Sequence, residues 1–191
     1  MNDLDIYMAG NTVKDFLRYR NKLMKLSNKP FVMFLNSGLR VFNYEPALEM
    51  MRENKRIFAV TFSTKSSGSG KVTEAEFANG GSSIYRRSAW NRAGGINLIY
   101  EPAFWDDVDL SEYVKRAGYK IIEDGRIWCI QLGEPGIEKL KRNIWMRFIE
   151  RRNYFIYLMI NRNDYYDKVK WTLHWLPFIL WAKFRYWKFT R

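Results

Sequence analysis

Three acidic residues close together are the feature of this sequence that most suggests chemistry. Asp106, Asp107 and Asp109 follow two large aromatic residues in the stretch "FWDDVDLSEYVKRAG". Carboxylates at this spacing repel one another unless a cation, a polar group or a reacting molecule lies between them. A carboxylate on a rigid turn between a strand and a helix can act as a general base. The cluster therefore indicates either a solvated loop or a catalytic pair.

Asp109 has a structural interpretation of its own. It stands three residues before Glu112, just ahead of "LSEYVKRAG", and this is the spacing of a capping box. Gly118 is placed to end the helix in the left-handed conformation. We therefore expect Asp109 to begin a helix and the other two aspartates to lie on the loop before it.

The elements that must hold this cluster alternate between strands and helices. Apolar runs at 29–36 and 56–62 predict buried strands, and a short apolar run at 5–9 is a further strand candidate. Residues 12–26 and 45–54 have helical spacing. This order is typical of an α/β layered sheet.

The second half of the chain predicts further elements of the same kind. Residues 63–83 are rich in Ser and Gly and predict a loop that is mobile or carries a hairpin. The stretch "SIYRRSAWNRAGG" predicts a short strand followed by a helix. Residues 119–132 predict one or two strands around a turn at Asp124–Gly125, and a helical pattern begins near Ile137.

The composition limits the class of protein. The 191 residues are 47% hydrophobic, which suits one domain with a core. A single cysteine, Cys129, excludes an internal disulfide framework. The N-terminus has no pattern of a signal peptide, and no apolar stretch reaches the ~20 residues that span a bilayer. We therefore expect a cytoplasmic protein, with peripheral contact to a membrane surface as an open alternative.

A longer stretch around the acidic cluster resembles a known family. Residues 78–122, "ANGGSSIYRRSAWNRAGGINLIYEPAFWDDVDLSEYVKRAGYKII", are similar to the second half of the family 2 glycosyltransferases, which typically have G-G, R-R, G-G, E-D-V-D-L and R-x-G-Y in this order. Three further stretches resemble elements of that family. The R-N helix of the family resembles "RYRNKLMKL" (18–26), and the strand before its D-x-D turn resembles "KPFVMFLNSGLRV" (29–41). Its basic aromatic helix resembles "RFIERRNYFIYLMI" (147–160).

The resemblance implies a GT-A fold and a mechanism. The fold is a Rossmann-like α/β architecture, a mixed sheet flanked by helices. We expect residues 1–136 to form the catalytic domain and residues 137–191 a helical, basic and aromatic extension packed on it. The implied reaction is inverting transfer of a sugar from a nucleotide-sugar donor, UDP- or GDP-linked, to a hydroxyl group of a glycan, protein or lipid-linked acceptor. Asp107 takes the position of the general base.

The same resemblance implies a set of substrate-binding positions. The residues at these positions are Trp105, Asp106, Asn36, Gly80, Gly81, Arg86 and Arg87. The two glycines either let the backbone approach the donor or simply shape a turn. The two arginines open a helix, where a surface role is the ordinary alternative.

The metal-binding motif of the family is altered. Members usually hold Mg²⁺ or Mn²⁺ with the D-x-D aspartates, and Asn36 and Gly38 stand at those positions. Either a cation such as Arg40, Arg86 or Arg87 neutralises the leaving diphosphate without a metal, or catalysis is impaired. An impaired protein would be a sugar- or partner-binding module.

Two regions set further expectations about partners. The segment before Asn36 is shorter than in the family, which predicts minimal or unusual base recognition, or help from a partner subunit in an oligomer. From Glu138 onward, 13 Lys and Arg stand against 4 Asp and Glu. Residues 165–191 suit a membrane-surface contact or plain helix packing, and a nucleic-acid partner is the weakest alternative.

Overall fold

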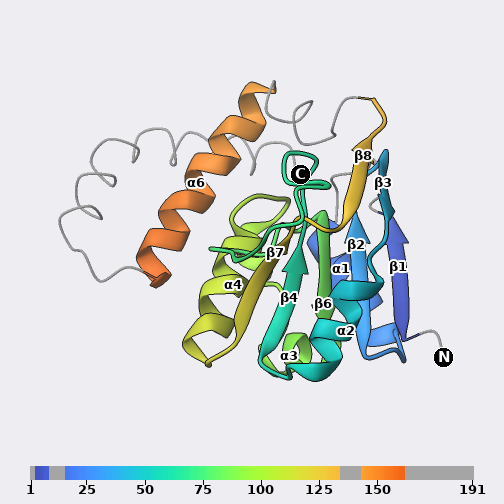
Figure 1. The fold of residues 1–191 in the computed structure, drawn as a ribbon. Helices are drawn as coiled ribbons and strands as arrows, with labels where there is room; N and C mark the ends of the chain where they lie inside the picture. The colour runs from blue at the N-terminus through green and yellow to red at the C-terminus, as the bar shows by residue number, and fades with distance from the viewer. Residues whose placement is uncertain (1–2, 9–15, 134–142, 162–191) are drawn as a thin grey trace.

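The centre of the protein is a six-stranded sheet in the order β1-β2-β6-β4-β7-β5 (Figure 1). This computed structural model describes residues 3–8, 16–133 and 143–161. The strands of the sheet are β1 (Leu4–Met8), β2 (Phe31–Leu35), β4 (Ile57–Thr61), β5 (Val72–Glu74), β6 (Ser82–Arg86) and β7 (Lys120–Asp124). A second sheet pairs β3 (Leu39–Phe42) with β8 (Trp128–Gln131).

The sheet is mixed because β6 enters between two parallel pairs. β1 runs parallel to β2 and β4 runs parallel to β7, whereas β6 is antiparallel to both β2 and β4. The expected strand-helix-strand order of the first half is confirmed. The predicted strands around Asp124–Gly125 are also confirmed, although they separate into different sheets as β7 and β8.

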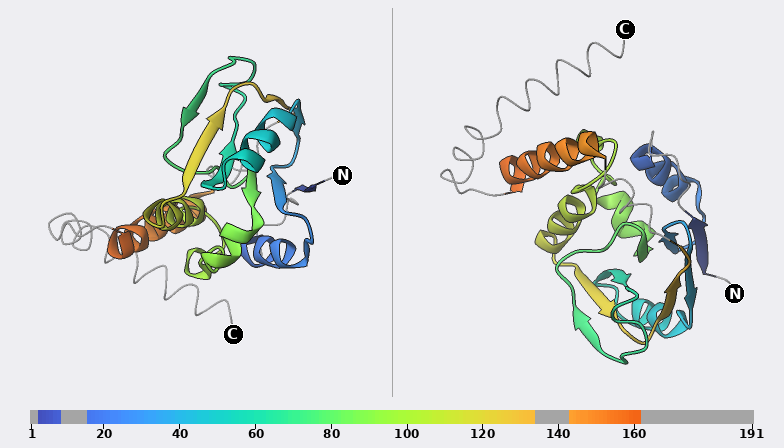
Figure 2. Two further views of the ribbon diagram at one scale, coloured as in Figure 1. Left: turned by 60° about the horizontal axis from the view of Figure 1, so that its bottom comes forward. Right: turned by 90° about the horizontal axis from the view of Figure 1, so that it is seen from above.

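Helices cover both faces of the sheet (Figure 2). The helices are α1 (Phe16–Leu26), α2 (Glu45–Glu53), α3 (Arg87–Arg92), α4 (Asp106–Arg116) and α6 (Ile144–Asn161), with a 3-10 turn at Leu98–Tyr100. One core packs the sheet against α1, α3 and α4, and the other packs it against α2 and the β3–β8 pair.

Strand β2 shows how the sequence builds both layers. Val32 and Phe34 point into the core shared with α1 and α3, and Phe31, Met33 and Leu35 point into the core shared with α2. All five residues are buried, because a strand covered on both faces alternates between two apolar environments.

The C-terminal region is described only in part. Within it, α6 packs on the core shared by the sheet with α1, α3 and α4, through Tyr157 and Leu158. The predicted domain boundary at 136/137, His174 and the predicted membrane-contact segment 165–191 lie outside the described residues. Among the helices that are described, none combines the length and the apolar character needed to cross a bilayer.

Candidate active site

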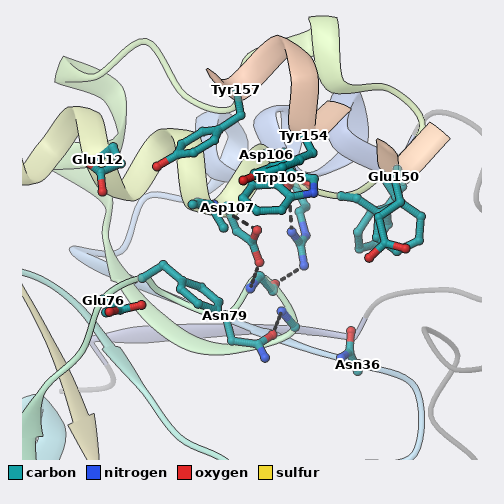
Figure 3. A pocket seen from close by; sticks show the side chains of 18 of the residues that line it. Asn36, Glu76, Asn79, Trp105, Asp106, Asp107, Glu112, Glu150, Tyr154 and Tyr157 are labelled. Carbon is teal, nitrogen blue, oxygen red and sulfur yellow. Dashed lines mark hydrogen bonds and ion pairs between the residues drawn. The ribbon is translucent and has the colours of Figure 1, made fainter. Parts of the chain in front are cut away.

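A cavity of about 630 Å³ lies beyond the carboxyl end of β2 (Figure 3). Four regions that are far apart in the sequence form its wall: α1, the segment before β6, the start of α4, and α6. Loops at the carboxyl ends of strands are where α/β sheets bind ligands. The lining side chains that matter below are those of Arg20, Asn36, Trp105, Asp106, Asp107, Tyr154 and Tyr157.

Helix α4 carries the acidic pair in its first turn. The helix begins at Asp106, and Trp105 precedes it in the left-handed conformation. The predicted capping box at Asp109 is therefore wrong, because Asp109 already lies inside the helix and accepts a hydrogen bond from the Asn161 amide at 2.6 Å. Gly118 follows the helix with φ 83°, as predicted. Aspartates in the first turn are favoured by the helix dipole, so placing Asp106 and Asp107 there is locally stabilising.

Asp107 is held at the cavity by backbone amides. Its Oδ2 accepts a hydrogen bond from the N–H of Gly80 at 3.1 Å, and its Oδ1 accepts one from the N–H of Val108 at 2.9 Å. The carboxylate is half-buried and lines the cavity. Both bonds fix its orientation while leaving it open to a molecule in the cavity (Figure 3).

Arg20 is the basic partner of the acidic pair. Its guanidinium lies 3.7 Å from Asp106 and donates to the carbonyl of Gly80. It also lies over the rings of Phe16 and Phe34, 4.3 and 5.4 Å from their centroids. Both members of the ion pair are buried, so the charges are held in a low-dielectric environment.

Burial and mutual repulsion change the titration of the pair. Asp106 is only 5% exposed, and burial together with the neighbouring charge of Asp107 raises the pKa of Asp106 to about 7. Burial also raises the pKa of Asp107, while the Gly80 amide and Arg20 act in the opposite direction. Near neutral pH, the state in which both carboxyls are ionised is therefore unfavourable.

This raised pKa predicts a pH-dependent stability. Protonated Asp106 is compatible with burial, whereas its ionisation between pH ~4 and ~7 costs the folded state free energy. Relative to Asp106→Asn, the wild type should lose about 2–4 kcal/mol of unfolding free energy over this range. Urea unfolding of both proteins at pH 4.5 and pH 8 measures the difference. A difference that stays constant with pH would contradict the raised pKa.

The predicted glycines and Asn36 do reach the site. A side chain at Gly80 would collide with the guanidinium of Arg20, and one at Gly81 would collide with the amide of Asn36. The N–H of Asn36 donates to the carbonyl of Gly81 at 2.6 Å, and its side chain lines the cavity. These glycines therefore allow the segment before β6 to pack closely against Arg20 of α1 and against Asn36 at the end of β2.

The structure does not bring the other predicted cations to the cavity. Arg86 is buried, and its guanidinium donates to the main-chain carbonyls of Ile57, Met51 and Asn54. Arg87 donates to the carbonyl of Lys29 at 2.8 Å, and Arg40 is exposed on β3. None of these arginines lines the cavity. Arg86 and Arg87 thus tie elements together, and neither is placed to neutralise a diphosphate there.

The D-x-D positions do not fit a divalent cation. Asn36 offers one neutral oxygen, and Gly38 lies in a turn with φ 80° against the carbonyl of Leu132. Mg²⁺ and Mn²⁺ prefer carboxylate oxygens, which neither residue supplies. Within the described parts of the chain, no group of three or more His, Cys, Asp or Glu is placed to hold a metal ion.

The sequence patterns did not lead us to predict two parts of the site. The first part is the R-N motif of α1, which consists of Arg20 and Asn21. The Asn21 side chain accepts a hydrogen bond from the N–H of Ile96 at 2.9 Å and donates one to the Ile96 carbonyl at 2.8 Å. On the other side, the Trp105 ring packs on Tyr154 and Tyr157 with ring centroids 4.5 and 5.1 Å apart. The motif could have identified Arg20, whereas no sequence signal places α6 beside Trp105.

Comparisons with known proteins agree with this arrangement at the level of the fold. Neither a protein family model nor a curated protein matches the sequence. Among solved structures, GalNAc-T7 with UDP, GalNAc and Mn²⁺ is similar, with a TM-score of 0.60 and 9% identity. The match covers 80% of this chain and 36% of that chain.

The chain has a GT-A-like fold. The predicted fold class is thereby confirmed, whereas the assignment to family 2 rests on the sequence motifs alone. The similar structure is that of a glycosyltransferase, and the GT-A-like protein described here spans only about a third of its length. At this identity the similarity concerns the fold, so the activity must be argued from the site.

Proposed function

We propose that this protein is an inverting glycosyltransferase with Asp107 as the general base. The observation that carries the proposal is the placement of the Asp107 carboxylate. It faces a cavity of about 630 Å³ on a GT-A-like fold, and the backbone amides of Gly80 and Val108 hold it there. The family 2 motifs around it support the same role.

The proposed reaction consists of a proton transfer to Asp107 and a displacement at the anomeric carbon of the donor. Asp107 takes the proton of an acceptor hydroxyl while that oxygen attacks the anomeric carbon of the donor. The bond between this carbon and the diphosphate oxygen breaks on the opposite face, and the nucleoside diphosphate leaves. Such a base contributes ~10²–10⁴ in rate, and alignment of donor and acceptor in the cavity supplies a further share.

Neighbouring residues support this role of Asp107. Asp106, with its pKa raised to about 7, is partly protonated near neutral pH and so reduces the repulsion on Asp107. Arg20 holds the Gly80 carbonyl, and thereby the segment whose amide binds Asp107. Trp105, Asn36 and the two glycines shape the wall that faces the substrate.

UDP-sugars are the first donors to test, because the similar GalNAc-T7 structure contains UDP, GalNAc and Mn²⁺. UDP- and GDP-sugars should be screened with and without Mn²⁺, with calorimetry for binding and detection of released nucleoside diphosphate for turnover. We expect both binding and turnover with at least one donor. Absence of binding by every donor would contradict the proposal.

A binding module without activity is the alternative that one observation favours. Asn36 and Gly38 lack the carboxylates that the family uses for its metal. The same experiment separates the two functions, because a binding module retains the calorimetric signal and releases no nucleoside diphosphate with any donor and acceptor.

A further inference from the structure

The segment that leads into α4 has a strained backbone. Phe104 and Trp105 have φ angles of 75° and 68°, a conformation that residues with a side chain rarely adopt. Such a conformation is unfavourable and persists only where the surroundings of the residue hold it. Asp106 and Asp107 follow at once, so this segment sets the direction in which the first turn of α4 points.

One fully buried side chain of α6 binds this segment. The Asn153 amide nitrogen donates to the carbonyls of Tyr100, Ala103 and Phe104 at 2.6, 2.7 and 3.1 Å. The Asn153 side chain is 0% exposed. The two hydrogens of the amide are thus shared among three carbonyls in a place that excludes water, where an unmet acceptor is costly.

The orientation of this amide is fixed chemically. Three carbonyl acceptors require the NH₂ end, and the guanidinium of Arg152 donates to the Oδ1 end at 2.7 and 2.9 Å. Arg152 also donates to the carbonyl of Glu101 at 2.6 Å. Neighbouring residues of α6 thus bind successive carbonyls of one irregular segment.

The same face of α6 also holds the side chain of Trp105. Tyr154 and Tyr157, one and four residues after Asn153, pack on the indole ring. Tyr157 is a helix-surface neighbour of both other residues, because it lies three positions after Tyr154 and four after Asn153. α6 therefore supplies both a polar and an aromatic contact to the strained segment.

We infer that Asn153 is a positioning residue that holds the segment before α4 so that Asp107 faces the cavity. Asn153 acts through the carbonyls of Ala103 and Phe104, and no contact with substrate is required of it. The inference rests on the proposed function and adds that α6, at the C-terminal end of the described chain, is part of the catalytic unit.

The test uses the full chain and two backgrounds. Asn153→Ala should lower kcat by about 10²-fold with donor affinity unchanged, because a displacement of about 1 Å in a reacting group has that effect.

The second background replaces Phe104 by glycine, which adopts the left-handed conformation without strain. In a Phe104→Gly background, the same Asn153→Ala change should therefore cost less than about tenfold in kcat. If Asn153→Ala fails to fold, Asn153→Ser, which keeps one donor, takes its place in the same comparison.

Asn161→Ala is the matched control on the same helix. Asn161 binds the Asp109 carboxylate outside the cavity wall, so its loss should leave kcat unchanged. Equal losses of kcat in the wild-type and Phe104→Gly backgrounds, or an unchanged kcat in Asn153→Ala, would overturn the inference.

An NMR titration that does not depend on turnover tests this inference separately from the proposed function. The carboxyl carbon signal of Asp107, assigned by its loss in Asp107→Asn, can be titrated by NMR in the wild type and in Asn153→Ala. Burial raises the pKa of Asp107, so release of the segment should lower that pKa toward the ordinary aspartate value. Lack of turnover in the wild type would remove the proposed function, and the titration would still decide the role of Asn153: an unchanged pKa would refute it.

Discussion

Asp107→Asn should reduce transfer by ~10²–10⁴-fold or more while the protein stays folded. An amide has the shape of the carboxylate, and its oxygen can still accept the hydrogen bond from the Gly80 amide. It cannot take a proton from an acceptor hydroxyl. The amide loses the hydrogen bond from the Val108 N–H, and removal of a charge that burial disfavours offsets this loss, so the melting temperature should change little.

The measurement is kcat/KM of the purified variant beside that of Asp109→Asn. Asp109 lies in the same turn of α4, but its carboxylate binds Asn161 and does not line the cavity. The control should retain wild-type transfer. Wild-type turnover in Asp107→Asn would remove the base from the mechanism, and equal losses in both variants would indicate a general effect of charge on α4.

Arg20→Ala should produce the largest loss of stability among these variants. The change leaves Asp106 buried without its cation and removes the donor to the Gly80 carbonyl. Removing one partner of a buried ion pair costs about 3–5 kcal/mol where the other partner keeps its charge. Because protonation of Asp106 relieves this cost, the loss should be larger at pH 8 than at pH 4.5. Transfer should fall as well, because the segment whose amide binds Asp107 loses its anchor.

Urea unfolding and transfer rates measure both effects. Arg18→Ala is the control on the same helix, since Arg18 is exposed and its ion pair with Glu101 at 2.7 Å should contribute less than about 1 kcal/mol. At pH 8 the double variant Arg20→Ala/Asp106→Asn should recover part of the lost stability, because it removes a carboxyl whose ionisation is uncompensated. A double variant no more stable than Arg20→Ala would show that the ion pair is not the cause.

Local patterns in the sequence were sufficient to predict most of the elements and to select Asp107, which lines the cavity, as the candidate base. The apolar run at 29–36 became β2, and the helix after β6 ends before two glycines with φ angles of 79° and 81°. Both predictions depend on the periodicity and turn chemistry of neighbouring residues, which are properties of a short stretch. The motif around Asp107 is local in the same way, and the role that it implies for this residue stays a prediction.

The start of α4 shows where local patterns fail. The spacing of Asp109 and Glu112 satisfies a capping box, yet the helix begins three residues earlier because Phe104 and Trp105 adopt left-handed conformations. α6, far along the chain, binds and packs on these two residues. A contact over about 50 residues leaves no periodic trace in either segment, so sequence spacing alone selects the wrong first residue.

The sequence by itself determined the α/β layering, the acidic pair and the resemblance that makes Asp107 the candidate base. Only the tertiary structure decided which charged groups act on that pair. In the folded chain Arg20 is buried beside Asp106, whereas the Arg86 guanidinium donates to main-chain carbonyls. Both arginines follow ordinary helix or strand patterns in the sequence. Their different roles arise from the partners that packing brings within hydrogen-bond distance, and such partners are set by the arrangement of whole elements in space.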